Sequence, residues 1–392
     1  MSKYELLAPA GDLEKLKIAI LYGADAVFIG GLKFSLRSRA SNFTIDDIKE
    51  GCDFAHKHGA RIHVTCNIVM HNLDTEGVID YLKELENAGV DCIIASSLYI
   101  LEMVKKHTKM EAHVSTQAST TNDEAVSFYE SLGMDRCVLS RELSLDEIEM
   151  IKKKSNIDLE VFIHGGMCVS YSGRCMLSNN MTNRDANRGG CAHSCRWCYD
   201  LVSESKVLNP PGDYFAMSSK DLCAITAIPR LMDIGVNSFK IEGRMKSLHY
   251  IATVVNSYRK IIDEYEKNHN VEDFDYYINQ ISKAENRLTS TGFLFNEPTV
   301  EQELYDLNLS VPTKDFIGIV KGYENGMLIV EVRNYFLPNT TIEVFTPNET
   351  FDLKIGNIYD LDGNIKESCN HPLEIVKFEG PKLDEYSLLR LK

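Results

Sequence analysis

Short apolar segments alternate with amphipathic helical patterns through most of the chain. The helical patterns, such as residues 13–23, 78–89 and 123–133, end in glycine, which commonly lies just past a helix C-terminus. Eight strands alternating with helices indicate a (β/α)8 barrel of the TIM type, and no GxGxxG motif follows the first strand to favour a Rossmann fold. The predicted strands are residues 5–10, 25–31, 61–67, 91–96, 111–117, 136–141, 158–165 and 238–244.

The pattern changes after two further helical segments, at residues 248–268 and 272–287. From Phe316 onward apolar and polar residues alternate with period two, and hairpin-type turns interrupt them, which predicts a small all-β barrel. We therefore expect a (β/α) barrel domain at residues 1–300, with an insertion at about residues 166–237, and a C-terminal β-barrel domain at residues 315–392.

Composition and charge limit the class of protein. The chain has 392 residues, 44% hydrophobic and 25% charged, as expected for a soluble globular protein with one large and one small domain. We find no apolar run of the roughly 18 residues that a membrane span needs, and no secretory signal, so we expect a cytoplasmic protein. The net charge of −15 means that any RNA contact needs a local basic surface.

Eleven cysteines without a secretory signal indicate reduced thiols, metal ligands or core residues rather than disulfides. Five of them carry no metal-site signal, and four of these lie in apolar patterns typical of small buried hydrophobic residues. These five are Cys52, Cys66, Cys92, Cys137 and Cys369, the last standing alone near the C-terminus. The other six, Cys168, Cys175, Cys191, Cys195, Cys198 and Cys223, lie in the insertion.

Four of the insertion cysteines are widely spaced, at positions 168, 175, 191 and 223. Structural zinc sites usually use paired CxxC motifs, whereas isolated thiolates in a folded insertion suit an iron–sulfur cluster. Zinc binding and plain core packing stay open as alternatives. Cys191, Cys195 and Cys198 also form a C-x3-C-x2-C motif typical of radical S-adenosylmethionine enzymes, although that motif normally follows the first strand. The role of Cys195 and Cys198 stays open.

Polar residues gather after the predicted strands, where TIM barrels carry their active sites. Arginine and lysine in the same loops suit a phosphate or a dicarboxylate, although loop caps and surface charges are alternatives. The candidate catalytic residues are His113, Gln117, Glu142, His164 and Glu242. The candidate substrate-binding residues are Arg37, Arg39, Arg174, Arg188, Lys240 and Arg244.

Residues 160–178 closely resemble the signature of peptidase family U32, the collagenase-like peptidases, which also includes RNA hydroxylation proteins. The resemblance extends to blocks within the barrel, such as residues 6–12, 187–191 and 218–223, and to the C-terminal β-domain. The chain departs from the signature at Gly166, where the family usually has Ser or Ala. The matching signature residues are Glu160, Phe162, Gly165, Cys168, Gly173, Cys175 and Ser178.

The resemblance implies a [4Fe–4S] cluster held by Cys168, Cys175, Cys191 and Cys223. Similar family members install an oxygen atom on RNA, notably as 5-hydroxyuridine at the tRNA wobble position, with prephenate-pathway metabolites implicated. Other members hydroxylate a ribosomal RNA cytidine or assist ubiquinone hydroxylation, and the older family label is collagenase-type proteolysis.

Hydroxylation accounts for the sequence better than proteolysis does. The sequence has no HExxH or GxSxG motif, and an iron–sulfur cluster adds nothing obvious to amide hydrolysis. We predict an iron–sulfur enzyme that takes part in tRNA wobble uridine hydroxylation. Its expected partners are the tRNA anticodon region, a small anionic oxygen donor such as prephenate, and a related family subunit. The alternatives are a collagenase-like peptidase, a radical S-adenosylmethionine enzyme and a non-catalytic accessory subunit.

Overall fold

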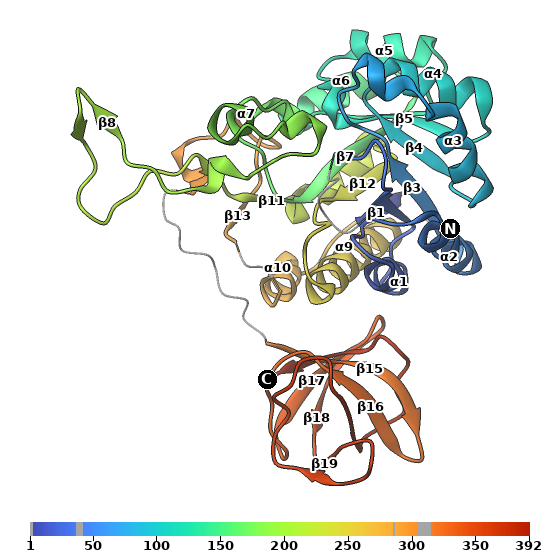
Figure 1. Cartoon of the computed structure of the whole chain (residues 1–392), viewed down its shortest axis with the longest axis vertical. Coiled ribbons are helices and arrows are strands. Elements are labelled where there is room, and N and C mark those ends of the chain that lie inside the picture. The colour runs from blue at the N-terminus through green and yellow to red at the C-terminus, as the bar shows by residue number, and fades with distance from the viewer. Residues whose placement is uncertain (1–2, 37–41, 285–286, 305–314) are drawn as a thin grey trace.

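The computed structural model describes residues 3–36, 42–284, 287–304 and 315–392. Its largest sheet contains a closed parallel barrel, because the last barrel strand pairs with both the first and the seventh (Figure 1). The predicted (β/α)8 barrel is therefore confirmed. The barrel strands are β1 (Glu5–Pro9), β2 (Ala26–Gly30), β3 (Arg61–Thr65), β4 (Cys92–Ala95), β5 (Glu111–Val114), β6 (Arg136–Val138), β7 (Asp158–Gly165) and β12 (Ser238–Ile241).

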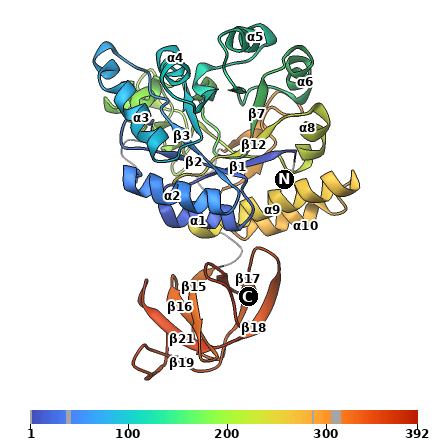
Figure 2. The same ribbon diagram turned by 90° about the vertical axis from the view of Figure 1, so that its right-hand side faces the viewer.

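Helices cover the outside of the barrel, and their first residues follow from local capping (Figure 2). Asp12 accepts a hydrogen bond from the third residue of the first helix, and Thr44 and Ser144 form capping boxes. The helices are α1 (Leu13–Leu21), α2 (Ile45–Lys57), α3 (Val78–Asn87), α4 (Leu98–His107), α5 (Asp123–Ser131), α6 (Leu145–Lys154), α8 (Ile228–Ile234), α9 (Leu248–Asn268) and α10 (Phe274–Ser282). Among the described residues, no helix is both long and apolar enough to span a membrane.

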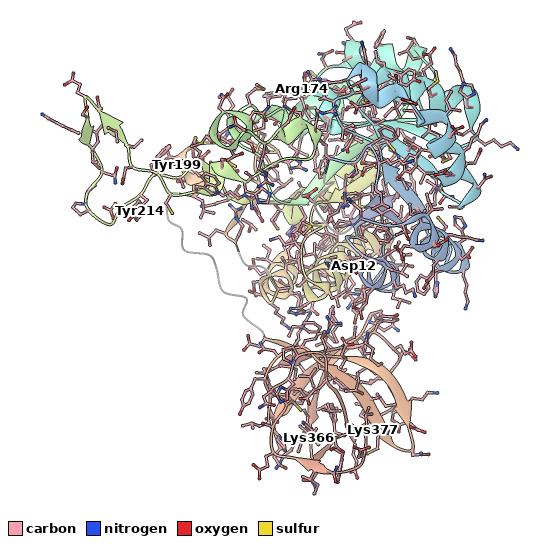
Figure 3. All side chains as sticks on the ribbon, in the orientation of Figure 1. Asp12, Arg174, Tyr199, Tyr214, Lys366 and Lys377 are labelled. Carbon is pink, nitrogen blue, oxygen red and sulfur yellow. The ribbon has the colours of Figure 1, made fainter. Side chains whose placement is uncertain are left out.

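The chain between β7 and α8 forms an irregular insertion at the carboxyl end of β7 (Figure 1). It contains α7 (Leu177–Thr182), the hairpin β8 (Val202–Ser203) and β9 (Lys206–Val207), β10 (Ser218–Ser219) and β11 (Asp221–Cys223). Strand β11 runs antiparallel to β7 and pairs Cys223 with His164. The β8–β9 hairpin projects away from the barrel, beyond Tyr199 and Tyr214 (Figure 3). The insertion is therefore joined to the barrel sheet through the pairing of β11 with β7.

The C-terminal part is a single antiparallel sheet that curls around its own apolar core (Figures 1 and 2). Both predicted hairpin turns are present, between its first and second strands and between its fifth and sixth. The strands are β15 (Phe316–Glu324), β16 (Met327–Val332), β17 (Thr341–Phe345), β18 (Thr350–Lys354), β19 (Ile358–Tyr359), β20 (Ile365–Lys366), β21 (Ile375–Glu379) and β22 (Leu388–Leu391).

A buried arginine docks this sheet on the barrel. Arg390 of β22 is fully buried, and its guanidinium donates to His249 Nε2 (2.7 Å), Thr253 Oγ1 (2.6 Å) and Glu343 Oε1 (3.0 Å). Burial, with nearby Arg390, holds the pKa of His249 well below its usual value, so the neutral ring can accept this hydrogen bond. Tyr22 of α1 donates to the carbonyl of Phe345 at 2.9 Å. The interface between the barrel and the sheet therefore includes buried polar contacts.

Candidate functional site

The four cysteines of the predicted cluster lie on the insertion and on β11, beyond the carboxyl end of β7. Cys168 and Cys191 are exposed, Cys223 is half-buried and Cys175 is buried. All eleven cysteines are free thiols, so none of them is tied up in a disulfide. The thiols are thus available as soft ligands on the face where barrels of this type carry their active sites.

Hydrogen bonds fix two of the cysteine segments against each other. Asn187 Oδ1 accepts from the backbone N–H of Cys175 (3.1 Å), and Asn187 Nδ2 donates to the Cys175 carbonyl (3.0 Å). Ser178 Oγ accepts from the N–H of Ala192 at 3.0 Å. Gly190 packs so closely that an added Cβ would lie 2.7 Å from the Asp185 carbonyl oxygen. Residues 187–191 therefore fix the backbone of Cys175, and the same segment of the insertion ends at Cys191.

The turn between Cys168 and Cys175 is anchored on the loop after β6. Ser172 adopts a left-handed conformation (φ 44°, ψ 37°) that is costly for a residue other than glycine. The carboxylate of Glu142 accepts from the Ser172 backbone N–H (2.7 Å) and from its hydroxyl (2.6 Å). These charge-assisted bonds offset the backbone strain and fix the turn.

The thiols of the insertion influence one another electrostatically. Burial raises the pKa of Cys168, and the neighbouring thiols of Cys175 and Cys191 raise it further. Burial likewise raises the pKa of Cys195, with further contributions from Cys168, Cys191 and Cys175. Where neighbouring thiols disfavour the charged form, as at Cys168 and Cys195, a bound cation stabilises the thiolates. The donor set therefore fits a soft metal centre.

Cys223 lies on the side of the insertion that contacts the barrel, because β11 pairs with β7. Its Sγ lies 3.9 Å from the hydroxyl of Tyr258, a fully buried residue of α9. The same hydroxyl donates to the Ile163 carbonyl (2.9 Å) and lies 3.2 Å from His164 Nδ1. Tyr258 thus connects β7 and β11 at the base of the insertion.

Four of the five candidate catalytic residues lie beside the insertion. Gln117 packs against Gly173, Glu142 holds Ser172, and His164 contacts Tyr258. Glu242 follows β12; its backbone N–H donates to the His164 carbonyl (2.8 Å), and its carboxylate lies 3.9 Å from Arg141 Nη2. Gln117, Glu142 and Glu242 thus lie in the loops after β5, β6 and β12, and His164 is a buried residue near the end of β7.

His113 is placed differently, because it is buried within the barrel. Its Nε2 lies 3.0 Å from Glu111 Oε2, and its ring lies 5.2 Å from that of His63. Nearby, Arg136 pairs with Glu5 and with Glu160 (3.3 Å), and Lys240 also pairs with Glu160 (2.7 Å). His113 thus belongs to a buried polar network rather than to the insertion.

The candidate substrate-binding cations differ in how they are held. Arg37 and Arg39 lie outside the described residues. Arg188 forms a bidentate ion pair with Asp74, and Arg244 is buried and donates to Ser35 Oγ (3.2 Å) and Asn42 Oδ1 (3.0 Å). Lys240 is also buried, and its ammonium group donates a hydrogen bond to Glu160.

Arg174 is an exposed residue of the insertion, and Figure 3 shows it near the top of the view. Its Nε donates to the Gln117 carbonyl at 3.1 Å. Of the candidate substrate-binding cations within the described part of the chain, Arg174 is the best exposed for an anionic partner.

The sequence reasoning did not identify several residues that build this site. Ser172 had no signal beyond its place between two cysteines. Asn187 lies in one of the blocks that resemble the family, but its two hydrogen bonds to the backbone of Cys175 depend on the fold. Asp221 is buried and lies 3.4 Å from Arg287 and 3.6 Å from Lys246, an arrangement that joins three distant segments.

Comparisons with known proteins agree with this architecture. The model of peptidase family U32 matches residues 11–304, and that of the peptidase family U32 C-terminal domain matches residues 312–390. The chain is similar to tRNA hydroxylation protein P1 of Bacillus subtilis, with 48% identity over 98% of this chain and 92% of the relative. It is also similar to tRNA hydroxylation protein P of Escherichia coli, with 33% identity over 93% of this chain and 90% of the relative.

A third relative carries a different name. The Collagenase of Porphyromonas gingivalis is 34% identical over 68% of this chain and 67% of the relative. The two family models together cover the barrel, the insertion and the C-terminal sheet. The chain therefore belongs to peptidase family U32.

Proposed function

We propose that this chain is an iron–sulfur enzyme that takes part in 5-hydroxylation of the tRNA wobble uridine. The observation that carries the proposal is the set of insertion thiols on the carboxyl face of the barrel. The relatives from Bacillus subtilis and Escherichia coli, each matched over more than nine-tenths of this chain, are both named as tRNA hydroxylation proteins, which supports the RNA substrate. The relative named as a collagenase covers a smaller part, 68% of the chain.

The proposed cofactor is a [4Fe–4S] cluster held by Cys168, Cys175, Cys191 and Cys223. When bound, such a cluster supplies one-electron redox chemistry or an iron that polarises an oxygen atom. The residues around it position these ligands: Asn187 holds the backbone of Cys175, and Tyr258 lies against Cys223.

Exposed arginine and aromatic side chains of the insertion support RNA binding. Arg174 is exposed, as are Tyr171 (56%) and Trp197 (43%). Guanidinium groups bind phosphate, and aromatic rings stack with unpaired bases such as those of an anticodon loop. Such a local surface is what an acidic protein needs to contact RNA. A small anionic oxygen donor such as prephenate and a related family subunit complete the proposal as further partners.

The experiment that tests this function is nucleoside mass spectrometry of tRNA from cells that lack the protein and any redundant hydroxylation pathway. We expect 5-hydroxyuridine and its derivatives to disappear and the wild-type gene to restore them. Cys175→Ser should fail to restore them, whereas Cys52→Ser, a buried cysteine of α2 outside the insertion, should succeed. Unchanged hydroxyuridine in the deletion strain would exclude the proposed function.

Proteolysis is the second candidate, because one relative is named Collagenase. Cleavage of gelatin by anaerobically purified protein, at an equal rate in wild type and Cys175→Ser, would favour it. A reaction that depends on the insertion thiols should instead be lost in this variant.

A further inference from the structure

Three metal-binding side chains meet inside the barrel, away from the insertion. His63 of β3, Cys92 of β4 and His113 of β5 each offer a ligand atom, and these atoms all lie within 4.8 Å of one another. The three strands are neighbours, with His63 directly paired to Cys92 and His113 paired to Ile94. All three residues have an exposed fraction of 0%. The register of three neighbouring strands therefore brings one cysteine and two histidines together, and no loop residue takes part.

The two imidazoles have unused hydrogen-bonding capacity. Within the described part of the chain, both ring nitrogens of His63 and Nδ1 of His113 have no hydrogen-bond partner. Buried polar atoms in native proteins are almost always paired, so an orphan atom indicates a bound water or ion. The surroundings of Cys92 are apolar, because it packs with Leu7, Phe28 and Ile94. The unpaired ring nitrogens of His63 and His113 are therefore open to a bound ion beside the Cys92 thiol.

The chemistry of the ligands is consistent with a transition-metal ion. Burial keeps the pKa of both histidines well below the usual value, so the rings are neutral, which is the ligating form. The carboxylate of Glu5 lies 4.0 Å from His63 Nε2 and provides a negative charge next to the group. Glu5 also pairs with Arg136. Arg136 forms further ion pairs with Glu160 (3.3 Å) and Asp158 (3.7 Å).

The dimensions can accommodate zinc. Zinc holds imidazole nitrogen at about 2.0–2.1 Å and thiolate sulfur at about 2.3 Å, so the ligand atoms of a tetrahedral site lie about 3.4–3.7 Å apart. The three ligand atoms here lie within 4.8 Å of one another, so binding requires any two of them to close by no more than about 1.4 Å. A mixed thiolate and imidazole set in a closed site is typical of structural zinc.

We propose that His63, Cys92 and His113 bind one zinc ion in the barrel interior, with the Glu5 carboxylate nearby as a negative charge. The ion links strands β3, β4 and β5. The site is sealed from solvent, so its role is to stabilise the barrel and not to bind substrate. On binding, the Cys92 thiol releases its proton to solvent and the thiolate coordinates the ion.

The test is zinc content, measured by mass spectrometry of the elements in anaerobically purified full-length protein. The background is a Cys168→Ser/Cys175→Ser variant, which removes insertion thiols that could themselves capture zinc. We expect one zinc per chain in wild type and in this background. Adding Cys92→Ser or His113→Gln should reduce zinc to near zero. Cys137 is a buried strand cysteine that belongs to a different apolar cluster from Cys92, so adding Cys137→Ser should leave the zinc content unchanged.

A second measurement covers the case in which Cys92→Ser folds poorly. Cobalt added to zinc-depleted protein of the same background should give an intense thiolate-to-cobalt absorption band in the near ultraviolet, and the band should persist with Cys137→Ser. Wild-type protein with no stoichiometric zinc, or a Cys92→Ser variant that keeps full zinc, would overturn the proposal.

Discussion

At the scale of single residues, the site depends on side chains that hold backbone as much as on side chains that bind ligands. Ser172 has a strained left-handed backbone, and Glu142 accepts two hydrogen bonds from it. Asn187 makes a paired amide contact with Cys175. Such contacts fix ligands before a metal binds, which lowers the entropy cost of ordering them.

Replacing Glu142 tests this role. Glu142→Ala leaves the Ser172 N–H and hydroxyl without their acceptor, which should lower the free energy of unfolding by about 1–3 kcal/mol. It should also reduce the iron retained per chain after anaerobic purification, measured by elemental analysis and visible absorption. Glu124→Ala removes an exposed glutamate of α5 and serves as the matched control. Equal iron and stability in both variants would show that Glu142 does not hold the turn.

At the scale of elements, helix α9 joins the barrel to the C-terminal sheet through His249 and Arg390. The pKa of His249 is well below 6.5 because the ring is buried and lies near Arg390 and Lys283. In the unfolded chain this histidine takes up a proton as the pH falls through about 6.5. The folded state resists that proton, so protonation favours unfolding at acid pH.

We therefore expect the free energy of unfolding to fall as the pH decreases from about 6.5 to 5, by up to about 1.4 kcal/mol per pH unit from His249. The groups near the ring are the cations Arg390 and Lys283, the Phe316 ring and, through Arg390, Thr253. His249→Gln should reduce this slope in urea titrations at several pH values. An unchanged slope would contradict a neutral, buried His249.

At the scale of the whole molecule, the C-terminal sheet is stabilised by its contact with the barrel as well as by its own core. Arg390 is fully buried against Glu343, and its guanidinium lies 3.9 Å from the ring of Phe345. Glu14 of α1 pairs with Lys321 (2.5 Å) and Arg333 (3.0 Å) across the same interface. The sheet and the barrel should therefore unfold together.

Truncating the buried arginine tests this coupling. Arg390→Ala leaves Glu343 with Lys283 as its remaining cation and creates a cavity at the interface, which should cost about 3–5 kcal/mol. Calorimetry should then resolve two transitions where the wild type shows one. Lys392→Ala, which loses an exposed ion pair with Asp352, should change stability by less than about 1 kcal/mol. A single transition of unchanged midpoint in Arg390→Ala would contradict the coupling.

The sequence by itself determined the elements and the family. The periods of two and 3.6 residues reflect local backbone geometry, so strands such as β7 and helices such as α9 were predicted close to their observed bounds. The cysteines of the insertion could also be predicted as metal ligands from the sequence, because thiol side chains are identified by residue type alone.

Only the tertiary structure decided which distant side chains meet. Cys92 was interpreted as an ordinary buried residue, yet strand register places it between two histidines. His113 was expected at the active-site face and lies in the barrel interior. Asn187 pairs with Cys175 on another turn of the irregular insertion, and Arg390 pairs with His249 across the interface. Barrel closure and packing fix these pairings, and no local period in the sequence encodes them.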